Sequence, residues 1–115
     1  MLACFCEGVS RIGGVGRLAG KESDRGSAIL QMLSQMGVRA VIEEDDMVIE
    51  GHSLCNRLIR GQLLHGGSYT SFHDHRIVMA LKVAELGADS PIVIDDTACV
   101  AKSYPNFIKD WNTAY

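Results

Sequence analysis

Two stretches of apolar residues at helical spacing constrain the fold of this chain most strongly. From Asp24 to Met36 apolar residues recur every three or four positions, which places them on one face of a helix. Gly37 follows directly, where a glycine commonly ends a helix. The apolar run from Ile77 to Leu86 predicts a second, largely buried helix that begins near Asp74. The chain is therefore expected to build its core around two helices.

Short apolar runs bounded by turn residues predict strands between and around these helices. An acidic turn over 43–46 joins two of the runs into a hairpin, and the stretch from residue 50 to residue 65 is expected to be a loop. Ser71 and Asp74 have the spacing of a capping box. Ser103-Tyr104-Pro105 is expected to begin a last helix, with proline in its first turn. The predicted strands cover 9–12, 38–42, 47–49 and 91–94.

The order of elements is therefore strand, helix, strand, strand, followed by a partial copy of the same theme. This predicts a mixed α/β (α+β) chain that forms one structural unit over residues 1–115. With 47% hydrophobic and 22% charged residues, the composition is that of an ordinary globular protein. Because the chain is short, its core is modest and its stability is expected to be marginal.

Composition also excludes several classes of protein. The net charge of −3 argues against binding nucleic acid through overall positive charge. No apolar run approaches the ~18 residues of a membrane span, and the N-terminal residues lack the pattern of a signal peptide. The four cysteines show neither a disulfide framework nor metal-ligand spacing, which favours reduced thiols in a cytoplasmic protein.

Charged residues gather at three predicted junctions between a loop and a helix. The segments are Lys21–Arg25, Asp74–Arg76 and Ala101–Ser103. Helix N-termini present free N–H groups, and lysine or arginine beside them grips phosphate or carboxylate. The segments therefore predict a local anion site in a protein of net negative charge. The alternative is that each cation is a solvated surface charge or is paired with a nearby acid.

The same three segments carry a resemblance to a known family. Residues 17–25, Arg-Leu-Ala-Gly-Lys-Glu-Ser-Asp-Arg, resemble the R-L-R-x-K-E-S-D-R string of the EPSP synthases. Residues 74–80 resemble the family's D-H-R-x-x-M-A string. Residues 94–107 resemble I-D-D-x-x-C-V-A-K-S-[FY]-P-x-F. The strings occur in family order and with family spacing, whereas the related UDP-N-acetylglucosamine enolpyruvyl transferases share the fold and lack them.

This resemblance implies a fold and a reaction. The fold is that of the enolpyruvyl transferases, an inside-out α/β barrel built from repeated βαβαββ units, of which this chain is the C-terminal part of the second domain. The reaction transfers the enolpyruvyl group of phosphoenolpyruvate to the 5-hydroxyl of shikimate 3-phosphate, in the pathway to chorismate and the aromatic amino acids. It needs no cofactor, and its partners are the two small substrates.

The resemblance also implies a role for each matching residue. Glu22 matches the position of the acid/base that delivers a proton to the enolpyruvyl methylene and later removes it. Arg25, Arg76 and Lys102 match the positions that grip the phosphate and carboxylate of phosphoenolpyruvate. Lys21 matches a catalytic position that contacts the phosphate of shikimate 3-phosphate and the developing intermediate.

Asp74 and His75 are expected to support the cations named above. Asp74 suits the start of a helix, where its carboxylate orients the cations without reacting. His75 is assigned a structural role, because residues adjacent on a helix point to different faces. His52, His65 and His73 have no partner in the pattern, and His73 with His75 lacks the usual spacing of a metal site. No metal is expected.

The chain also departs from the family pattern. Ala19 stands where an arginine is common, which weakens the assignment of substrate contacts to residues 17–20. The resemblance implies that the catalytic aspartate precedes Met1 and that an N-terminal domain completes the site. The chain alone is therefore expected to be inactive. Two alternatives remain, namely the UDP-N-acetylglucosamine activity and a non-catalytic anion-binding module of the same fold.

Overall fold

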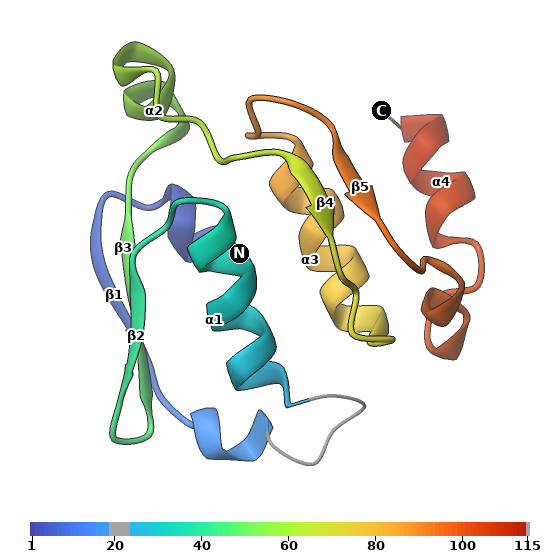
Figure 1. Cartoon of the computed structure of the whole chain (residues 1–115), viewed down its shortest axis with the longest axis horizontal. Coiled ribbons are helices and arrows are strands. Elements are labelled where there is room, and N and C mark those ends of the chain that lie inside the picture. Colours follow the sequence, from blue (N-terminus) through green and yellow to red (C-terminus); the bar gives the residue numbers. More distant parts are fainter. Residues whose placement is uncertain (19–23, 115) are drawn as a thin grey trace.

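The computed structural model describes residues 1–18 and 24–114. Figure 1 shows one sheet on one side of a central helix, and a second pair of strands with its own helix on the other side. The strands are β1 (Gly8–Ile12), β2 (Ala40–Glu43), β3 (Asp46–Gly51), β4 (Gly67–Tyr69) and β5 (Ile92–Ile94). The α-helices are α1 (Arg25–Gln35), α2 (Leu54–Arg60), α3 (His75–Glu85) and α4 (Phe107–Ala114). Three short 3-10 helices are η1 (Leu2–Phe5), η2 (Val15–Leu18) and η3 (Ala98–Lys102).

The first half of the chain forms a three-stranded antiparallel sheet with α1 beside it. The strand order is β1-β3-β2, so β3 lies in the middle. Gly8 pairs with Gly51 at one end of the β1–β3 ladder, and Ile12 pairs with Met47 at the other. The burial of β3 alternates along its length, so one face of this sheet covers α1. The expected hairpin is confirmed.

The second half is a parallel pair of strands joined through a helix. β4 and β5 pair in parallel, with Gly67 opposite Ile92 and Tyr69 opposite Ile94. α3 makes the crossover between them, as a parallel connection requires. The partial copy of the strand and helix theme is thus confirmed. It contains one strand that was not expected, β4, which Figure 1 shows beside β5.

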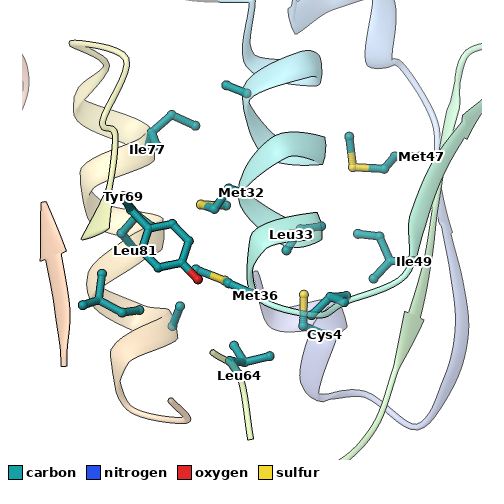
Figure 2. Close-up of a cluster of buried hydrophobic side chains, with 14 residues drawn as sticks. Cys4, Met32, Leu33, Met36, Met47, Ile49, Leu64, Tyr69, Ile77 and Leu81 are labelled. Atoms are coloured by element: carbon teal, nitrogen blue, oxygen red, sulfur yellow. The ribbon is translucent and has the colours of Figure 1, made fainter. Parts of the chain in front are cut away.

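One hydrophobic core joins the two halves around α1. Figure 2 shows Leu33 of α1 directed towards Ile49 and Met47 of β3, while Met32 and Met36 lie towards α3 and β4. The side chains of Met32 and Leu33 in α1, and of Met36 at its C-cap, are almost completely buried. The apolar face predicted for this helix is therefore its buried face, and α1 fixes how the sheet and α3 lie relative to each other.

Both main helices begin at an aspartate. Asp24 accepts a hydrogen bond from the backbone N–H of Ser27, and Asp74 accepts one from that of Arg76. Gly37 has a φ angle of +83°, the left-handed conformation that ends α1. The predicted starts of both helices are confirmed, but the N-cap of α3 is Asp74 itself and Ser71 instead accepts a bond from His73 N–H.

The prediction of a loop over residues 50–65 was wrong. This stretch contains α2, which begins after the cap at Ser53 and ends at Gly61. Its apolar residues Leu58 and Ile59 are exposed and its Arg57 is buried, so its pattern does not resemble that of a helix packed on a core. Arg57 is buried because its guanidinium donates hydrogen bonds to backbone oxygens. The spacing of apolar residues does not reveal such contacts.

The start of the last helix was also predicted wrongly. α4 begins at Phe107, so Pro105 lies before the helix and outside its first turn. η3 precedes this segment, and Tyr104 N–H, just beyond η3, bonds back to Val100 O. The family string over 94–107 therefore spans a strand, a 3-10 helix and the beginning of α4.

Gly61 provides a test of the way α2 ends. Its φ angle is +65°, and the space where a Cβ atom would lie is empty. Gly61→Ala is expected to lower the free energy of unfolding by about 1 kcal/mol, because only the left-handed backbone is strained. Gly61→Asn is the matched control, since asparagine tolerates this conformation and should cost less. Urea unfolding measures both, and equal stability of all three proteins would contradict the assignment.

Candidate functional site

An ion pair joins the starts of the two main helices. Arg25 Nε donates to Asp74 Oδ2 at 2.7 Å, and Arg25 Nη2 donates to Asp74 Oδ1 at 3.2 Å. The Asp74 side chain is fully buried and that of Arg25 is 15% exposed. This two-point contact fixes the plane of the guanidinium group. The residues are 49 positions apart in sequence, so the contact belongs to the tertiary fold.

Arg76 lies in the first turn of the same helix as its N-cap, Asp74. Its backbone N–H donates to Asp74 Oδ1 at 2.9 Å, and its side chain is exposed. Among residues 1–18 and 24–114, the guanidinium of Arg76 has no hydrogen-bond partner. The Asp74 carboxylate therefore accepts hydrogen bonds from the guanidinium of Arg25 and from the backbone N–H of Arg76, while the guanidinium of Arg76 faces solvent.

Lys102 reaches the same place from the end of η3. Its Nζ donates to the backbone oxygen of His73 at 3.0 Å. Because His73 directly precedes Asp74, this contact brings Lys102 to the start of α3. Figure 1 shows the starts of α1 and α3 together with η3 at the same end of the molecule. The structure thus places Arg25, Arg76 and Lys102 around the start of α3, and these three residues form a cation cluster.

The two predicted catalytic residues cannot be placed in this arrangement. Lys21 and Glu22 lie outside the described residues, which resume at Asp24. Their assignments rest on the sequence alone. Asp24 and Arg25, the last two residues of the same string, form the cap and first residue of α1.

The side chain of His75, which lies next to Arg76 in the sequence, is buried and is not exposed at the cation cluster. Its side chain is 7% exposed, and its Nδ1 atom has no hydrogen-bond partner among the residues that the structure describes. A buried imidazole in the first turn of α3 packs against the interior. This placement agrees with a structural role, and nothing in the geometry gives His75 a reacting partner.

Sequence reasoning missed the contact of His73 with an acid. His73 Nδ1 lies 2.7 Å from Asp96 Oδ2, and Asp96 Oδ1 accepts a hydrogen bond from Ala98 N–H. The hydrogen bond from His73, and after it that from Ala98, lowers the pKa of Asp96. Asp95, its neighbour, accepts from Ser71 N–H, which lowers the pKa of Asp95 as well. The only signal in the sequence was the Asp-Asp pair itself.

A cavity of about 540 Å³ lies elsewhere, at the C-terminal end of α1. The guanidinium of buried Arg57 donates to three backbone carbonyl oxygens there, which accounts for its burial without an acidic partner. Basic side chains near helix C-termini suit the negative end of the helix dipole. This cavity shares no residue with the cation cluster. Its basic lining residues are Arg39, His52, Arg57 and His65.

Two further properties follow from the described residues. No group of three or more His, Cys, Asp or Glu side chains among them is arranged to hold a metal ion. None of the helices in residues 1–18 and 24–114 combines the length and apolar character needed to cross a membrane.

Solved structures define the class of this fold. An EPSP synthase from Acinetobacter baumannii matches with a TM-score of 0.82 and 34% identity, over 97% of this chain and 25% of that protein. The fold is thus that of an enolpyruvyl transferase, seen here as strands and helices without a closed barrel.

Sequence relatives narrow the class to one family. A profile of the EPSP synthase (3-phosphoshikimate 1-carboxyvinyltransferase) family matches residues 1–111. The 3-phosphoshikimate 1-carboxyvinyltransferase of Rhodopseudomonas palustris is 42% identical over 106 residues, which is 92% of this chain and 22% of that protein. That of Brachyspira hyodysenteriae is 38% identical over 112 residues. The chain belongs to the EPSP synthase family, and it spans about a quarter of the length of these relatives.

Proposed function

We propose that this chain is the C-terminal quarter of an enzyme that transfers the enolpyruvyl group of phosphoenolpyruvate to the 5-hydroxyl of shikimate 3-phosphate. The observation that carries the proposal is the meeting of Arg25, Arg76 and Lys102 around the start of α3. These residues come from three separate family strings. A trianionic substrate with a phosphate and a carboxylate needs such convergent cations.

The proposed chemistry has two steps. The 5-hydroxyl gives up its proton to an aspartate outside this chain and adds to C2 of phosphoenolpyruvate. A proton is delivered to C3, which gives a tetrahedral intermediate with a methyl group. The C2–O bond to phosphate then breaks, and a proton leaves the methyl group to restore the double bond. Glu22 is the acid/base for the C3 proton in both steps. Phosphate is released with the enolpyruvyl product.

The cations have complementary tasks in this scheme. Arg25 and Lys102 are held by Asp74 and by the carbonyl of His73, so their charges are fixed before substrate arrives. Arg76 presents its guanidinium to solvent at the same end of the fold. Preorganised cations stabilise the negative charge that develops on the phosphate as the C2–O bond breaks. Lys21 is assigned to the phosphate of shikimate 3-phosphate and to the intermediate.

The remainder of the enzyme completes the site. We infer that residues 1–115 form the C-terminal part of the second domain, and that an N-terminal domain closes over the substrates. Such closure excludes water and assembles a site from both sides. Free thiols at all four cysteines suit the cytoplasm, where the substrates would be encountered.

The 115-residue chain alone is expected to show no transferase activity. Each lost contact to a buried charge weakens binding by about 2–5 kcal/mol, and several such contacts belong to the missing part. The test adds shikimate 3-phosphate and phosphoenolpyruvate to the chain and measures phosphate release. The complete enzyme, encoded by the reading frame that includes the upstream part, is the positive control.

The outcomes separate the alternatives. Enolpyruvyl transfer by the chain alone would mean that the essential residues lie within these 115 positions. A complete enzyme that used UDP-N-acetylglucosamine instead of shikimate 3-phosphate would overturn the proposed substrate. A complete protein that bound phosphoenolpyruvate without releasing phosphate with either acceptor would be a binding module.

A further inference from the structure

The turn that precedes α3 has an unusual backbone. The φ angles of the consecutive residues Phe72 and His73 are +53° and +52°, in the left-handed region that favours glycine. Such angles persist only where surrounding contacts hold them, and they cluster at functional sites. Because this turn leads directly into Asp74, whatever holds the turn also fixes the start of α3.

The two acids after β5 supply the holding contacts. Ser71 N–H donates to Asp95 Oδ1 at 2.8 Å, and His73 Nδ1 lies 2.7 Å from Asp96 Oδ2. Asp96 Oδ1 also accepts a hydrogen bond from Ala98 N–H at 2.9 Å, at the start of η3. One carboxylate therefore bridges the strained turn and the short helix that carries Lys102.

His73 contacts both ends of η3. Its imidazole bonds to Asp96 just before the helix, and its backbone oxygen accepts from Lys102 Nζ at the end of the helix. A change in the backbone of His73 therefore moves the acceptor of the lysine ammonium. Since His73 is next to the N-cap of α3, the same change shifts the start of that helix.

We propose that His73 and Asp96 are a positioning pair, which holds Lys102 and the start of α3 in register for phosphoenolpyruvate. This proposal rests on the proposed function, and neither residue is assigned a contact with substrate. The His73 side chain is 80% exposed, so the pair contributes little to stability. Loss of the pair is instead expected to change the positions of the cations.

Variants of the complete enzyme test the pair. His73→Gly keeps the left-handed backbone without strain but removes the bond to Asp96. It is expected to raise KM for phosphoenolpyruvate about tenfold, the effect of weakening one hydrogen bond to a charged group. KM for shikimate 3-phosphate should remain close to that of the unaltered enzyme. Asp96→Ala should produce the same split, and the double variant should be no worse than either single one.

A conservative variant and two controls complete the design. His73→Asn should restore most of the lost affinity, because asparagine tolerates the left-handed backbone and its amide donates to Asp96. Glu44→Gly relieves a similar backbone angle, φ +55°, in the distant hairpin. His65→Ala removes a second exposed His–Asp pair, with Asp89 at 3.4 Å. Both controls should leave KM unchanged, and an equal rise in both KM values for His73→Gly would overturn the proposal.

A measurement on the 115-residue chain separates this inference from the proposed function. In amide NMR spectra, Asp96→Asn is expected to shift the signals of Asp74, Arg76 and Lys102 as well as those of its direct neighbours. Shifts confined to residues 95–98 and His73 would overturn the positioning role. An inactive complete enzyme would refute the proposed function alone, because the NMR pattern does not depend on turnover.

Discussion

Replacing Glu22 with glutamine in the complete enzyme is expected to lower turnover by about 10²–10⁴-fold, the usual cost of removing a positioned acid/base. Glutamine keeps the size and most hydrogen-bonding capacity of glutamate but does not exchange a proton. Binding of both substrates should therefore be nearly unchanged. Rapid-quench measurement of the chemical step, with equilibrium titration of each substrate, distinguishes loss of chemistry from loss of binding.

Glu44→Gln is the matched control for this variant. Glu44 is an exposed glutamate in the β2–β3 turn, away from the cation cluster. Its replacement should leave both rate and affinity unchanged. If Glu22→Gln turned over at the rate of the unaltered enzyme, Glu22 would have no part in the mechanism, and the assignment from the Lys-Glu-Ser-Asp-Arg string would fail with it.

The sequence predicted the parts of the fold that depend on apolar spacing. α1 and α3 each present a face to one core, so their periodicity was visible in the chain. α2 was missed because its apolar residues point outwards and its arginine is buried. β4 was missed because Gly67 and Ser68 lack the side chains typical of strands. Its position depends on pairing with β5, which is a tertiary contact.

For the candidate site, too, the local features were predicted and the tertiary contacts were not. Cations at helix starts were predicted because local sequence marks where helices begin. Asp74 was expected to orient the cations, but the contacts themselves were not predicted, since Arg25 meets Asp74 across 49 positions and Lys102 meets the backbone oxygen of His73 across 29. Asp95 and Asp96 belonged to a recognised string, but only the fold shows that they grip the turn before α3.

Loss of the Asp74 side chain is expected to lower the stability of the chain strongly. It is fully buried, it pairs with Arg25 at two points, and it caps α3. Asp74→Ala is expected to lower the free energy of unfolding by about 3–5 kcal/mol, because a largely buried arginine loses its carboxylate. That is a large share of the 5–15 kcal/mol typical of a small protein. Urea unfolding followed by circular dichroism measures it.

A second aspartate makes the test specific to the ion pair. Asp24→Ala removes the N-cap of α1, an exposed cap whose loss typically costs about 1 kcal/mol. The difference between the two variants therefore includes the part due to Arg25. Combining Asp74→Ala with Arg25→Met should recover some stability, because the unpaired charge is then gone. If Asp74→Ala cost no more than Asp24→Ala, the contact between α1 and α3 would be a helix cap and not an ion pair that sets the arrangement of the site.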